Sequence, residues 1–362
     1  MNFACARLQH WVSNAQEIGG FLVTKKENIF WLTGFSGSTG LYLQLKSGEK
    51  FLITDSRYAE RAKELANENE MEFVLLDNDF RENFGEKIKG TFAGEDSMSL
   101  AQLERIKRLF PRVKFNPQKK ALEHLRRQKN LEELKLIRVA QGHVNQLLHP
   151  FLKANIKEGM TEKELAFGLE TALRDKGKFD LSFPAIVAFN SNSAIPHHEP
   201  NETKLKIGDN ILIDCGVKYQ GYCSDVTRNF AFRGASREYQ KAYQDLLQVQ
   251  EKSLLEFVPN KKVREIDEFV RRELGSNEAF FTHSLGHGVG LEVHELPLII
   301  GVQTQDKKSS NSETVLQENE VVTSEPGIYF PNKFGIRIED LLVIRKDKPE
   351  ILSTITKDLI VL

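Results

Sequence analysis

Two aspartates flank a predicted β-hairpin in the second half of the chain. Residues 210–232 consist of an apolar run, a Lys-Tyr-Gln-Gly turn and a second apolar run, a pattern typical of paired strands. Asp214 and Asp225 are equidistant from the middle of that turn, between Tyr219 and Gln220, so we expect the two side chains to face each other across the strands. Carboxylates placed in this way repel each other unless a cation or a shared proton neutralises them.

A second predicted hairpin repeats the design. The apolar runs 321–330 and 334–344 flank a Pro-Asn-Lys turn, and Glu325 and Glu339 are equidistant from Asn332. Acidic residues are unfavourable in strands, so each carboxylate needs a reason to interrupt an apolar run. A single pair would be interpreted as acids on a solvated face. Two pairs, both centred on turns between apolar strands, favour a metal site.

Three histidines lie between the two hairpins. His283, His287 and His294 fall within twelve positions and make up a third of the nine histidines of the chain. The glycines among them do not match the G-x-G-x-x-G dinucleotide motif, and the segment has no H-E-x-x-H zinc motif. One isolated histidine is usually a core residue, but three histidines among closely spaced glycines indicate a site.

Four carboxylates and one or two histidines make an oxygen-rich set of metal ligands. Such a set suits Mn²⁺, Co²⁺, Fe²⁺ or Zn²⁺ better than a structural zinc ion held by thiolates. Two ions about 3.5 Å apart lower the pKa of a water molecule held between them, which makes the water a nucleophile near neutral pH. The predicted chemistry is therefore the hydrolysis of an amide or an ester.

The elements that position these residues belong to the second of two predicted domains. In the first, residues 20–35 and 40–54 are strand-like, whereas residues 56–69 and 100–110 have a helical pattern. This alternation predicts an α/β domain over residues 1–126.

The second predicted domain covers residues 127–362 and begins with a strongly helical pattern. Thr161 and Glu164 make a capping box for a second helix. Strand-like stretches follow, and two more helices are predicted over residues 237–257 and 263–274.

The motifs around the acidic residues and the histidines closely resemble those of the Xaa-Pro aminopeptidase and prolidase family. The resemblance covers essentially the whole chain. It implies an α/β (α+β) metal-dependent hydrolase, with a creatinase-like N-terminal α/β domain followed by the pita-bread metallopeptidase domain also found in methionine aminopeptidase. The matching segments, in the family's order, are Asp214-Cys-Gly, Ser-Asp225-Val-Thr-Arg, His283-x-x-Gly-His287-Gly-x-Gly-Leu-x-Val-His294-Glu, Ser-Glu325-Pro-Gly-Ile-Tyr and Gly-Ile-Arg-Ile-Glu339-Asp.

The resemblance also implies the metal ligands. It assigns two divalent metal ions, with Mn²⁺ as the first choice and Co²⁺, Zn²⁺ or Fe²⁺ as alternatives, to Asp214, Asp225, His287, Glu325 and Glu339. Glu325 would also carry a proton to the leaving nitrogen. Arg337 would orient a metal-bound carboxylate.

Further histidines would contact the substrate, again by resemblance to the family. His294 and His197 would bind the substrate carbonyl, where negative charge develops. His283 would line the proline pocket. His198 lies next to His197 and could take its place.

The family contains aminopeptidases, which act on longer peptides, and dipeptidases. A dipeptidase must hold the free carboxylate of a C-terminal proline, which favours an arginine in the pocket. Leu298 stands where several microbial dipeptidases have that arginine, although Lys307 or Lys308 could substitute for it. We therefore expect an Xaa-Pro aminopeptidase, with an Xaa-Pro dipeptidase as the alternative. Trp31 and Arg57, in segments that resemble aminopeptidases P, are further candidates for substrate contact.

Two other kinds of protein share this fold. A non-catalytic pita-bread binding protein would lack ligands, and none is missing here. A creatinase-like enzyme would not need all five. The expected partners are peptides with proline at the second position, and a homodimer is expected from the family.

Composition argues against several other classes of protein. The formal net charge is −1, so no overall field favours nucleic acid or an anionic membrane. The three cysteines are too few and odd in number for a disulfide framework, and we expect Cys215 and Cys223 to be core residues. The first twenty residues do not contain the basic segment and following apolar run that mark a secretory signal, so we expect a cytoplasmic protein.

Overall fold

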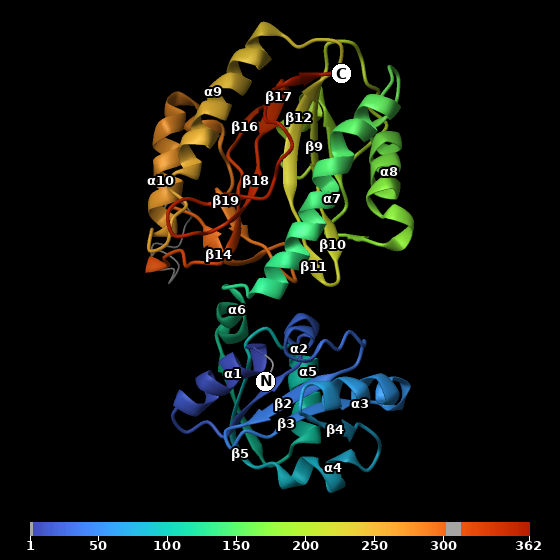
Figure 1. The fold of residues 1–362 in the computed structure, drawn as a ribbon, viewed down its shortest axis with the longest axis vertical. Coiled ribbons are helices and arrows are strands. Elements are labelled where there is room, and N and C mark those ends of the chain that lie inside the picture. The colour runs from blue at the N-terminus through green and yellow to red at the C-terminus, as the bar shows by residue number, and fades with distance from the viewer. Residues whose placement is uncertain (1–2, 302–312) are drawn as a thin grey trace. The chain divides into compact units, whose positions relative to one another are not determined.

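The computed structural model describes residues 3–301 and 313–362. The chain divides into two compact units, Met1–Arg126 and Arg127–Leu362. Figure 1 traces the elements of each unit along the chain. The second unit contains every residue predicted for the metal site.

The first unit is built on a six-stranded sheet with the strand order β4-β3-β2-β1-β5-β6. β2 pairs antiparallel with both β1 and β3, whereas β5 runs parallel to β1 and to β6, and β3 runs parallel to β4. Its strands are β1 (Gly20–Val23), β2 (Leu41–Leu45), β3 (Lys50–Thr54), β4 (Glu72–Leu75), β5 (Gly90–Glu95) and β6 (Val113–Gln118). Its helices are α1 (Phe3–Asn14), α2 (Lys26–Thr33), α3 (Ala59–Glu68), α4 (Phe80–Asn83), α5 (Leu100–Leu109) and α6 (Ala121–Arg126), with short 3-10 turns η1 (Ser56–Tyr58) and η2 (Gly85–Lys87). The predicted α/β character is confirmed.

Helix α2 replaces part of the strand-like run that the sequence predicts over residues 20–35. Its buried Leu32 and Thr33 follow the buried Ile29 by three and four positions, which places both on the side of the helix that carries Ile29. The helix ends at Gly34, whose φ of 74° gives the left-handed cap that glycine adopts at little cost. The aromatic and β-branched content of this segment suggests a strand, but its spacing and its cap favour a helix.

The two candidate substrate contacts of the first unit differ in exposure. Trp31, on α2, is buried. Arg57 is exposed, and its guanidinium donates to the two carboxylate oxygens of Asp55 at 3.0 and 2.8 Å and to Thr39 Oγ1 at 3.1 Å. A contact of either residue with a substrate stays a prediction.

The second unit forms sheets with the strand orders β11-β10-β7, β20-β12-β9-β8, β14-β13-β15-β18-β19 and β16-β17. Its strands are β7 (Asp180–Leu181), β8 (Ile186–Phe189), β9 (Asn210–Cys215), β10 (Val217–Tyr219), β11 (Tyr222–Cys223), β12 (Val226–Ala231), β13 (Gly286–Gly288), β14 (Glu295–Ile299), β15 (Val321–Ser324), β16 (Gly327–Phe330), β17 (Phe334–Arg337), β18 (Asp340–Val343), β19 (Glu350–Ile351) and β20 (Ile360–Val361). Its helices are α7 (Leu131–Asn155), α8 (Glu162–Leu173), α9 (Arg237–Leu254) and α10 (Val263–Leu274), with 3-10 turns η3 (Asp175–Gly177), η4 (Asn190–Ala194) and η5 (Gly275–Phe280).

Helices α7 and α8 share one core with strands β8, β9 and β12. The buried Ala140, Val144 and Leu148 of α7 recur every fourth residue and form an apolar stripe. At the start of α8, the Thr161 side chain accepts from the Glu164 amide, and the Glu164 side chain accepts from the Thr161 amide. The predicted capping box is therefore confirmed.

Helices α9 and α10 share a second core with strands β15, β16, β17 and β18. α10 has the predicted bounds, and α9 ends three residues before the predicted Phe257. Figure 1 shows these helices on the side of the strands opposite to α7 and α8. The strands that carry or adjoin the predicted metal ligands therefore lie between two helical layers.

The cysteines of this unit are core residues, as predicted. Cys215 and Cys223 have no exposed surface and form no disulfide. Burial raises the pKa of Cys215 well above its ordinary value and that of Cys223 to about 11, so both thiols stay protonated and are poor metal ligands. Among the described residues, no helix is long and apolar enough to span a membrane.

Glu350 joins the start of β19 to two arginines. Arg138 of α7 donates to both of its carboxylate oxygens at 2.8 and 2.9 Å. Arg345 donates twice to its Oε2, at 3.1 and 2.8 Å. These hydrogen bonds lower the pKa of Glu350 to about 2, and those from Arg138 have the largest effect.

Replacing Glu350 with glutamine is expected to lower the free energy of unfolding at pH 7 by about 0.5 to 1 kcal/mol, since the pair is partly solvent-screened. The pKa of Glu350 is lower in the folded protein than its ordinary value of about 4.3, so its ionised carboxylate stabilises the fold fully at pH values above about 4.3. This stabilisation is lost as the pH falls toward the pKa that Glu350 has in the folded protein. Urea titrations from pH 7 to pH 2 should show the two proteins converging below pH 4. A constant difference down to pH 2 would contradict the assignment.

Candidate functional site

The first predicted pair of carboxylates lies on β9 and at the start of β12, in a register different from the predicted one. Asp214 is opposite Thr227, not Asp225. The turn is centred between Gln220 and Gly221, one residue later than predicted. Both of these residues have positive φ, 46° and 89°, as a two-residue type I′ turn requires. The prediction of direct pairing is therefore wrong, and the aspartates are diagonal neighbours on one face.

The second pair follows the predicted register. β15 pairs with β18, and β16 pairs with β17, both in a register centred on Asn332. Glu325 and Glu339 lie between these two stretches of pairing. Pro326, which has no amide hydrogen to donate, follows Glu325 at this interruption. The symmetric placement of the two glutamates about Asn332 is confirmed.

Glycines allow β13 to lie close to both of its neighbours. A Cβ atom on Gly286 would be 2.1 Å from the Thr323 carbonyl oxygen, and one on Gly288 would be 2.2 Å from that of Leu296. His287 stands between these two glycines. The close packing brings its imidazole to the carboxylates of the two hairpins.

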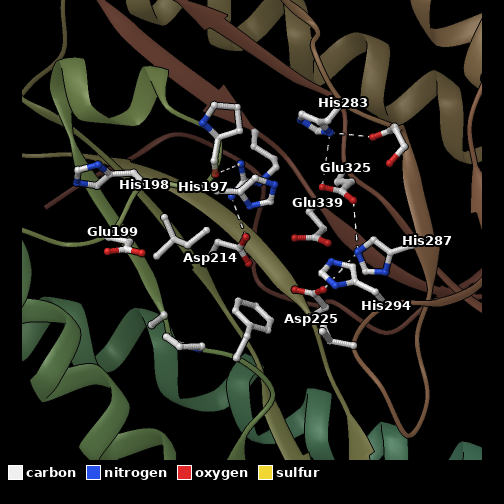
Figure 2. A pocket seen from close by; sticks show the side chains of 18 of the residues that line it. His197, His198, Glu199, Asp214, Asp225, His283, His287, His294, Glu325 and Glu339 are labelled. Carbon is white, nitrogen blue, oxygen red and sulfur yellow. Dashed lines mark hydrogen bonds and ion pairs between the residues drawn. The ribbon is translucent and has the colours of Figure 1, made fainter. Parts of the chain in front are cut away.

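All nine predicted site residues line one cavity of about 680 Å³ in the second unit. Figure 2 shows the side chains of Asp214, Asp225, His287, Glu325 and Glu339 around a common point. The remaining four, which complete the predicted set, are His197, His283, His294 and Arg337.

The donor atoms of this cluster fit a divalent metal. Asp225, His287 and Glu339 each offer one ligand atom, and these atoms lie within 4.8 Å of one another. His287 Nε2 lies 3.4 Å from Glu325 Oε1 and 3.7 Å from Asp225 Oδ2. Among the described residues, nothing donates a hydrogen bond to the buried Oδ1 of Asp214. A buried carboxylate oxygen without a donor is costly, and a cation would satisfy it.

Ionisation of the cluster also favours a cation. Burial, together with repulsion from Glu339, raises the pKa values of Asp225 and Glu325 well above normal. Burial, with repulsion from Asp214, raises the pKa of Glu339 to about 8. Burial lowers the pKa of His287 to about 3. Its Nδ1 donates to the Gly288 carbonyl at 3.1 Å, which leaves the Nε2 lone pair for a metal.

Arg337 contacts one predicted ligand directly and a second through a hydroxyl group. Its Nη2 donates to Asp214 Oδ2 at 2.8 Å, and its Nε donates to Thr227 Oγ1 at 3.0 Å. Thr227 in turn donates to Glu339 Oε2 at 2.7 Å. Sequence reasoning missed Thr227, although its place two residues after Asp225 puts it on the ligand-bearing face. The orienting role of Arg337 stays a prediction that this geometry favours.

His283 has both ring nitrogens engaged. Its Nδ1 donates to the Ser284 carbonyl at 2.8 Å, and burial lowers its pKa to about 3, so the ring is neutral. Its Nε2 therefore accepts a hydrogen bond from the Tyr329 hydroxyl at 2.8 Å. The oxygen of the same hydroxyl accepts a hydrogen bond from Arg337 Nη1 at 2.8 Å. Only the ring surface of His283 remains to contact a proline. Tyr329 was not predicted, because in the sequence it reads as one more apolar strand residue.

The three other histidines differ in orientation. His197 and His294 are exposed in the cavity lining. His198 is buried, and its Nε2 donates to Glu162 Oε2 at 2.7 Å. Both His197 and His198 line the cavity, but Figure 2 shows His198 pointing away from the predicted metal ligands. This arrangement favours His197 over the alternative His198.

The position expected to hold an arginine in a dipeptidase is apolar. Leu298 is opposite His287 in the β13–β14 register and lines the cavity. Arg337, which also lines the cavity, is already paired with Asp214. The alternative cations, Lys307 and Lys308, lie outside the described residues.

Comparisons with known proteins agree with this geometry. Residues 135–346 match metallopeptidase family M24, and residues 5–128 match the Creatinase/Prolidase N-terminal domain. An Xaa-Pro dipeptidase of Pyrococcus horikoshii is 31% identical over 346 residues, which cover 95% of this chain and 95% of that protein.

Solved structures show the same fold. An Xaa-Pro dipeptidase from Bacillus anthracis matches with a TM-score of 0.89 and 30% identity over 99% of both chains. An X-Pro aminopeptidase from Thermotoga maritima matches with a TM-score of 0.86 and 33% identity over 98% of this chain and 100% of that one. This chain therefore belongs to metallopeptidase family M24, as a metal-dependent hydrolase with a creatinase-type N-terminal domain and a pita-bread catalytic domain.

Proposed function

We propose that the chain is an Xaa-Pro dipeptidase that works with two divalent metal ions. The main support for a hydrolytic function is that four carboxylates and His287 line one cavity. Similarity over nearly the whole chain to proteins described as Xaa-Pro dipeptidases favours this reading over the aminopeptidase expected from the sequence.

The proposed metal ligands are the five predicted side chains. When bound, the ions would polarise the scissile carbonyl and increase the acidity of water. Buried oxygen ligands with one imidazole favour Mn²⁺ or a neighbouring transition metal. Mn²⁺ itself, a homodimer and a cytoplasmic location stay predictions. The proposed ligands are Asp214, Asp225, His287, Glu325 and Glu339.

Glu325 is the group that we propose to move the proton. It lines the cavity with its Oε1 3.4 Å from His287 Nε2. As the oxygen of water bonds to the carbonyl carbon, the carboxylate of Glu325 takes the proton that water releases. The same carboxylate then gives this proton to the proline nitrogen as the carbon–nitrogen bond breaks, so no charge accumulates on the leaving group.

The proposed role of His197 and His294 is to stabilise the substrate oxygen. Both are exposed in the cavity lining, whereas the ligand His287 is buried. The rings of His294 and His287 are 4.3 Å apart between centroids, so a substrate beside the metal ligands lies within reach of His294. Each histidine would donate a hydrogen bond to the carbonyl oxygen as its negative charge grows.

An aminopeptidase is the second candidate. Leu298 offers no charge to a free proline carboxylate, and the X-Pro aminopeptidase of Thermotoga maritima is as similar as the dipeptidases. A longer peptide continues past proline and needs no cation at that position.

The two candidates are separated by three substrates that share one Xaa-Pro bond: the dipeptide, its C-terminal amide and a tripeptide. With Mn²⁺ we expect kcat/KM for the dipeptide to exceed that for the amide by about 10- to 100-fold, because a hydrogen bond to a charged group contributes about 1.5 to 3 kcal/mol. The amide has the same size and lacks only the charge. Faster cleavage of the tripeptide and the amide would establish the aminopeptidase instead.

Replacing Asp214 with alanine is expected to remove metal. By elemental analysis, the metal content of the purified protein should fall from about two equivalents per chain to one or fewer, because one of the two ions would lose a carboxylate ligand. Glu199→Gln is the matched control, since Glu199 lines the same cavity away from the ligand cluster. Unchanged metal content in Asp214→Ala would count against the ligand assignment.

A further inference from the structure

A buried carboxylate holds the loop between β8 and β9 that carries His197. Glu162, the first residue of α8, has no exposed surface. Each of its carboxylate oxygens accepts two hydrogen bonds, and all four donors belong to residues 189–201. The donors are the Phe189 amide at 2.7 Å, Asn192 Nδ2 at 2.9 Å, His198 Nε2 at 2.7 Å and the Asn201 amide at 3.1 Å.

The backbone at the start of α8 binds the same segment. The Glu162 amide donates to the Thr203 carbonyl at 3.1 Å, and the Lys163 amide donates to the Asn201 carbonyl at 3.2 Å. These are amides that a helix leaves without partners at its first turn. The N-terminus of α8 therefore fixes the end of the loop through both main chain and side chain.

The opposite side of the loop is held by β17. Arg337 Nη1 donates to the Pro196 carbonyl at 3.2 Å. The Gly335 amide donates to Ser193 Oγ at 2.8 Å. His197, which directly follows Pro196, therefore lies between the Arg337 anchor and the Glu162 anchor.

The Glu162 anchor also holds one of the two neighbouring histidines that line the cavity. His198 is buried and donates to Glu162, with its side chain directed away from the predicted metal ligands (Figure 2), whereas His197 is exposed in the cavity lining. Loss of the Glu162 carboxylate would release His198 and both ends of the loop together.

We infer that Glu162 is a positioning residue that holds His197 against the substrate carbonyl. The inference rests on the proposed function, in which His197 binds that oxygen. A carboxylate suits this task because both of its oxygens accept. In Glu162→Gln the amide nitrogen only donates, so two of the four donors would lose their acceptor.

A double-mutant cycle tests the inference. The variants are Glu162→Gln, His197→Ala and the double variant, assayed on whichever peptide the wild type cleaves fastest. Glu162→Gln should lower kcat by about 10- to 100-fold, as loss of a supporting hydrogen bond does in metal sites, with a much smaller change in KM. In the His197→Ala background the same change should have almost no effect, because Glu162 acts through His197. Independent, multiplying losses would overturn the inference.

Glu164→Gln is the matched control. It removes the same negative charge from the first turn of α8, where that charge interacts with the helix dipole. Glutamine still completes the capping box with Thr161. We expect kcat to stay at the wild-type level. An equal loss in Glu164→Gln would show that helix-end charge, not the loop anchor, is responsible.

Two further measurements keep the test decisive. Calorimetric titration with Mn²⁺ should give the same affinity for Glu162→Gln and wild type. A weakened affinity would overturn the inference, because it would show that Glu162 acts through the metal ligands.

If Glu162→Gln does not fold, variants of His198 test the same anchor. His198→Phe should lower kcat about 10-fold, whereas His198→Gln, which can donate to Glu162, should have a kcat close to that of the wild type. Equal rates in these two variants would overturn the inference.

Different results would refute the inference about Glu162 and the proposed dipeptidase function. A wild type that cleaves tripeptides but not dipeptides refutes the dipeptidase, and the cycle is then measured on the tripeptide with the same expectations.

Discussion

Glu325→Gln is expected to lower kcat by about 10²- to 10⁴-fold, the range over which a positioned general acid or base contributes. The variant keeps the shape of the side chain but can neither take a proton from water nor deliver one to the proline nitrogen. It also loses the charge of a proposed metal ligand. Steady-state kinetics at saturating Mn²⁺, with circular dichroism to verify folding, would measure the loss, and near-normal turnover would refute the role.

Glu339→Gln separates the two functions of Glu325. Both variants remove one carboxylate from the same hairpin, but the proposed proton transfer is assigned to Glu325 alone. At equal metal content, determined by elemental analysis, Glu325→Gln should retain less activity than Glu339→Gln. Equal activities would mean that Glu325 is a ligand and nothing more.

The second large effect is expected at a buried ion pair next to Glu339, a proposed metal ligand. Arg228, with 1% of its surface exposed, donates to Asp340 Oδ1 at 2.7 Å and also to the backbone carbonyl of Glu339. The other oxygen of Asp340 accepts from Gln250 at 2.9 Å and from Lys357 at 3.0 Å. Although burial opposes ionisation, Arg228 and Lys357 keep the pKa of Asp340 below its ordinary value.

Asp340→Asn is expected to lower the free energy of unfolding of the second unit by about 3 kcal/mol, because it leaves the buried Arg228 cation uncompensated. Both tryptophans, Trp11 and Trp31, belong to the first unit, so near-ultraviolet circular dichroism of tyrosine is the probe to follow during urea denaturation. The midpoint should fall with little change in slope.

Asp245→Asn is the control for this prediction. Asp245 pairs with Lys241 at 2.9 Å on the exposed surface of α9, where an ion pair contributes at most about 1 kcal/mol. A loss in Asp340→Asn no larger than that in Asp245→Asn would show that the buried pair is not structurally important.

Local rules were sufficient for several elements of the second unit. The bounds of α10 follow from helical spacing, and the start of α8 follows from the Thr161 and Glu164 capping box. The register of the second hairpin follows from the symmetry of its apolar runs about Asn332. In each case the determining residues are close together in the sequence.

The first hairpin shows where pattern symmetry was insufficient. Apolar runs alone centre its turn between Tyr219 and Gln220, but the backbone requires two residues of positive φ, which Gln220 and Gly221 provide. A glycine in the turn is the signal that locates the register correctly. Turn chemistry outweighs symmetry because the strands must match the twist that the turn imposes.

The supporting residues of the site were not predictable from their own neighbourhoods. Thr227, Tyr329 and Glu162 act on partners 112, 46 and 36 positions away, at Glu339, His283 and His198. Such contacts arise only when the fold brings distant segments together, and a single sequence gives no measure of them. The four predicted carboxylate ligands were visible in the sequence because each interrupts an apolar run, and His287 was visible because it lies among other histidines and closely spaced glycines.

β12 has no face turned to solvent, since each of its six residues is buried. Any substitution there must satisfy both core packing and the geometry of the carboxylates, so few changes would survive natural selection. Substitutions, whether natural or engineered, should be tolerated better in the cavity wall, at the half-buried Ile186, Val293 and Leu298. A library randomised at those three positions would vary which peptide is cut while the strand preserves the hydrolytic chemistry.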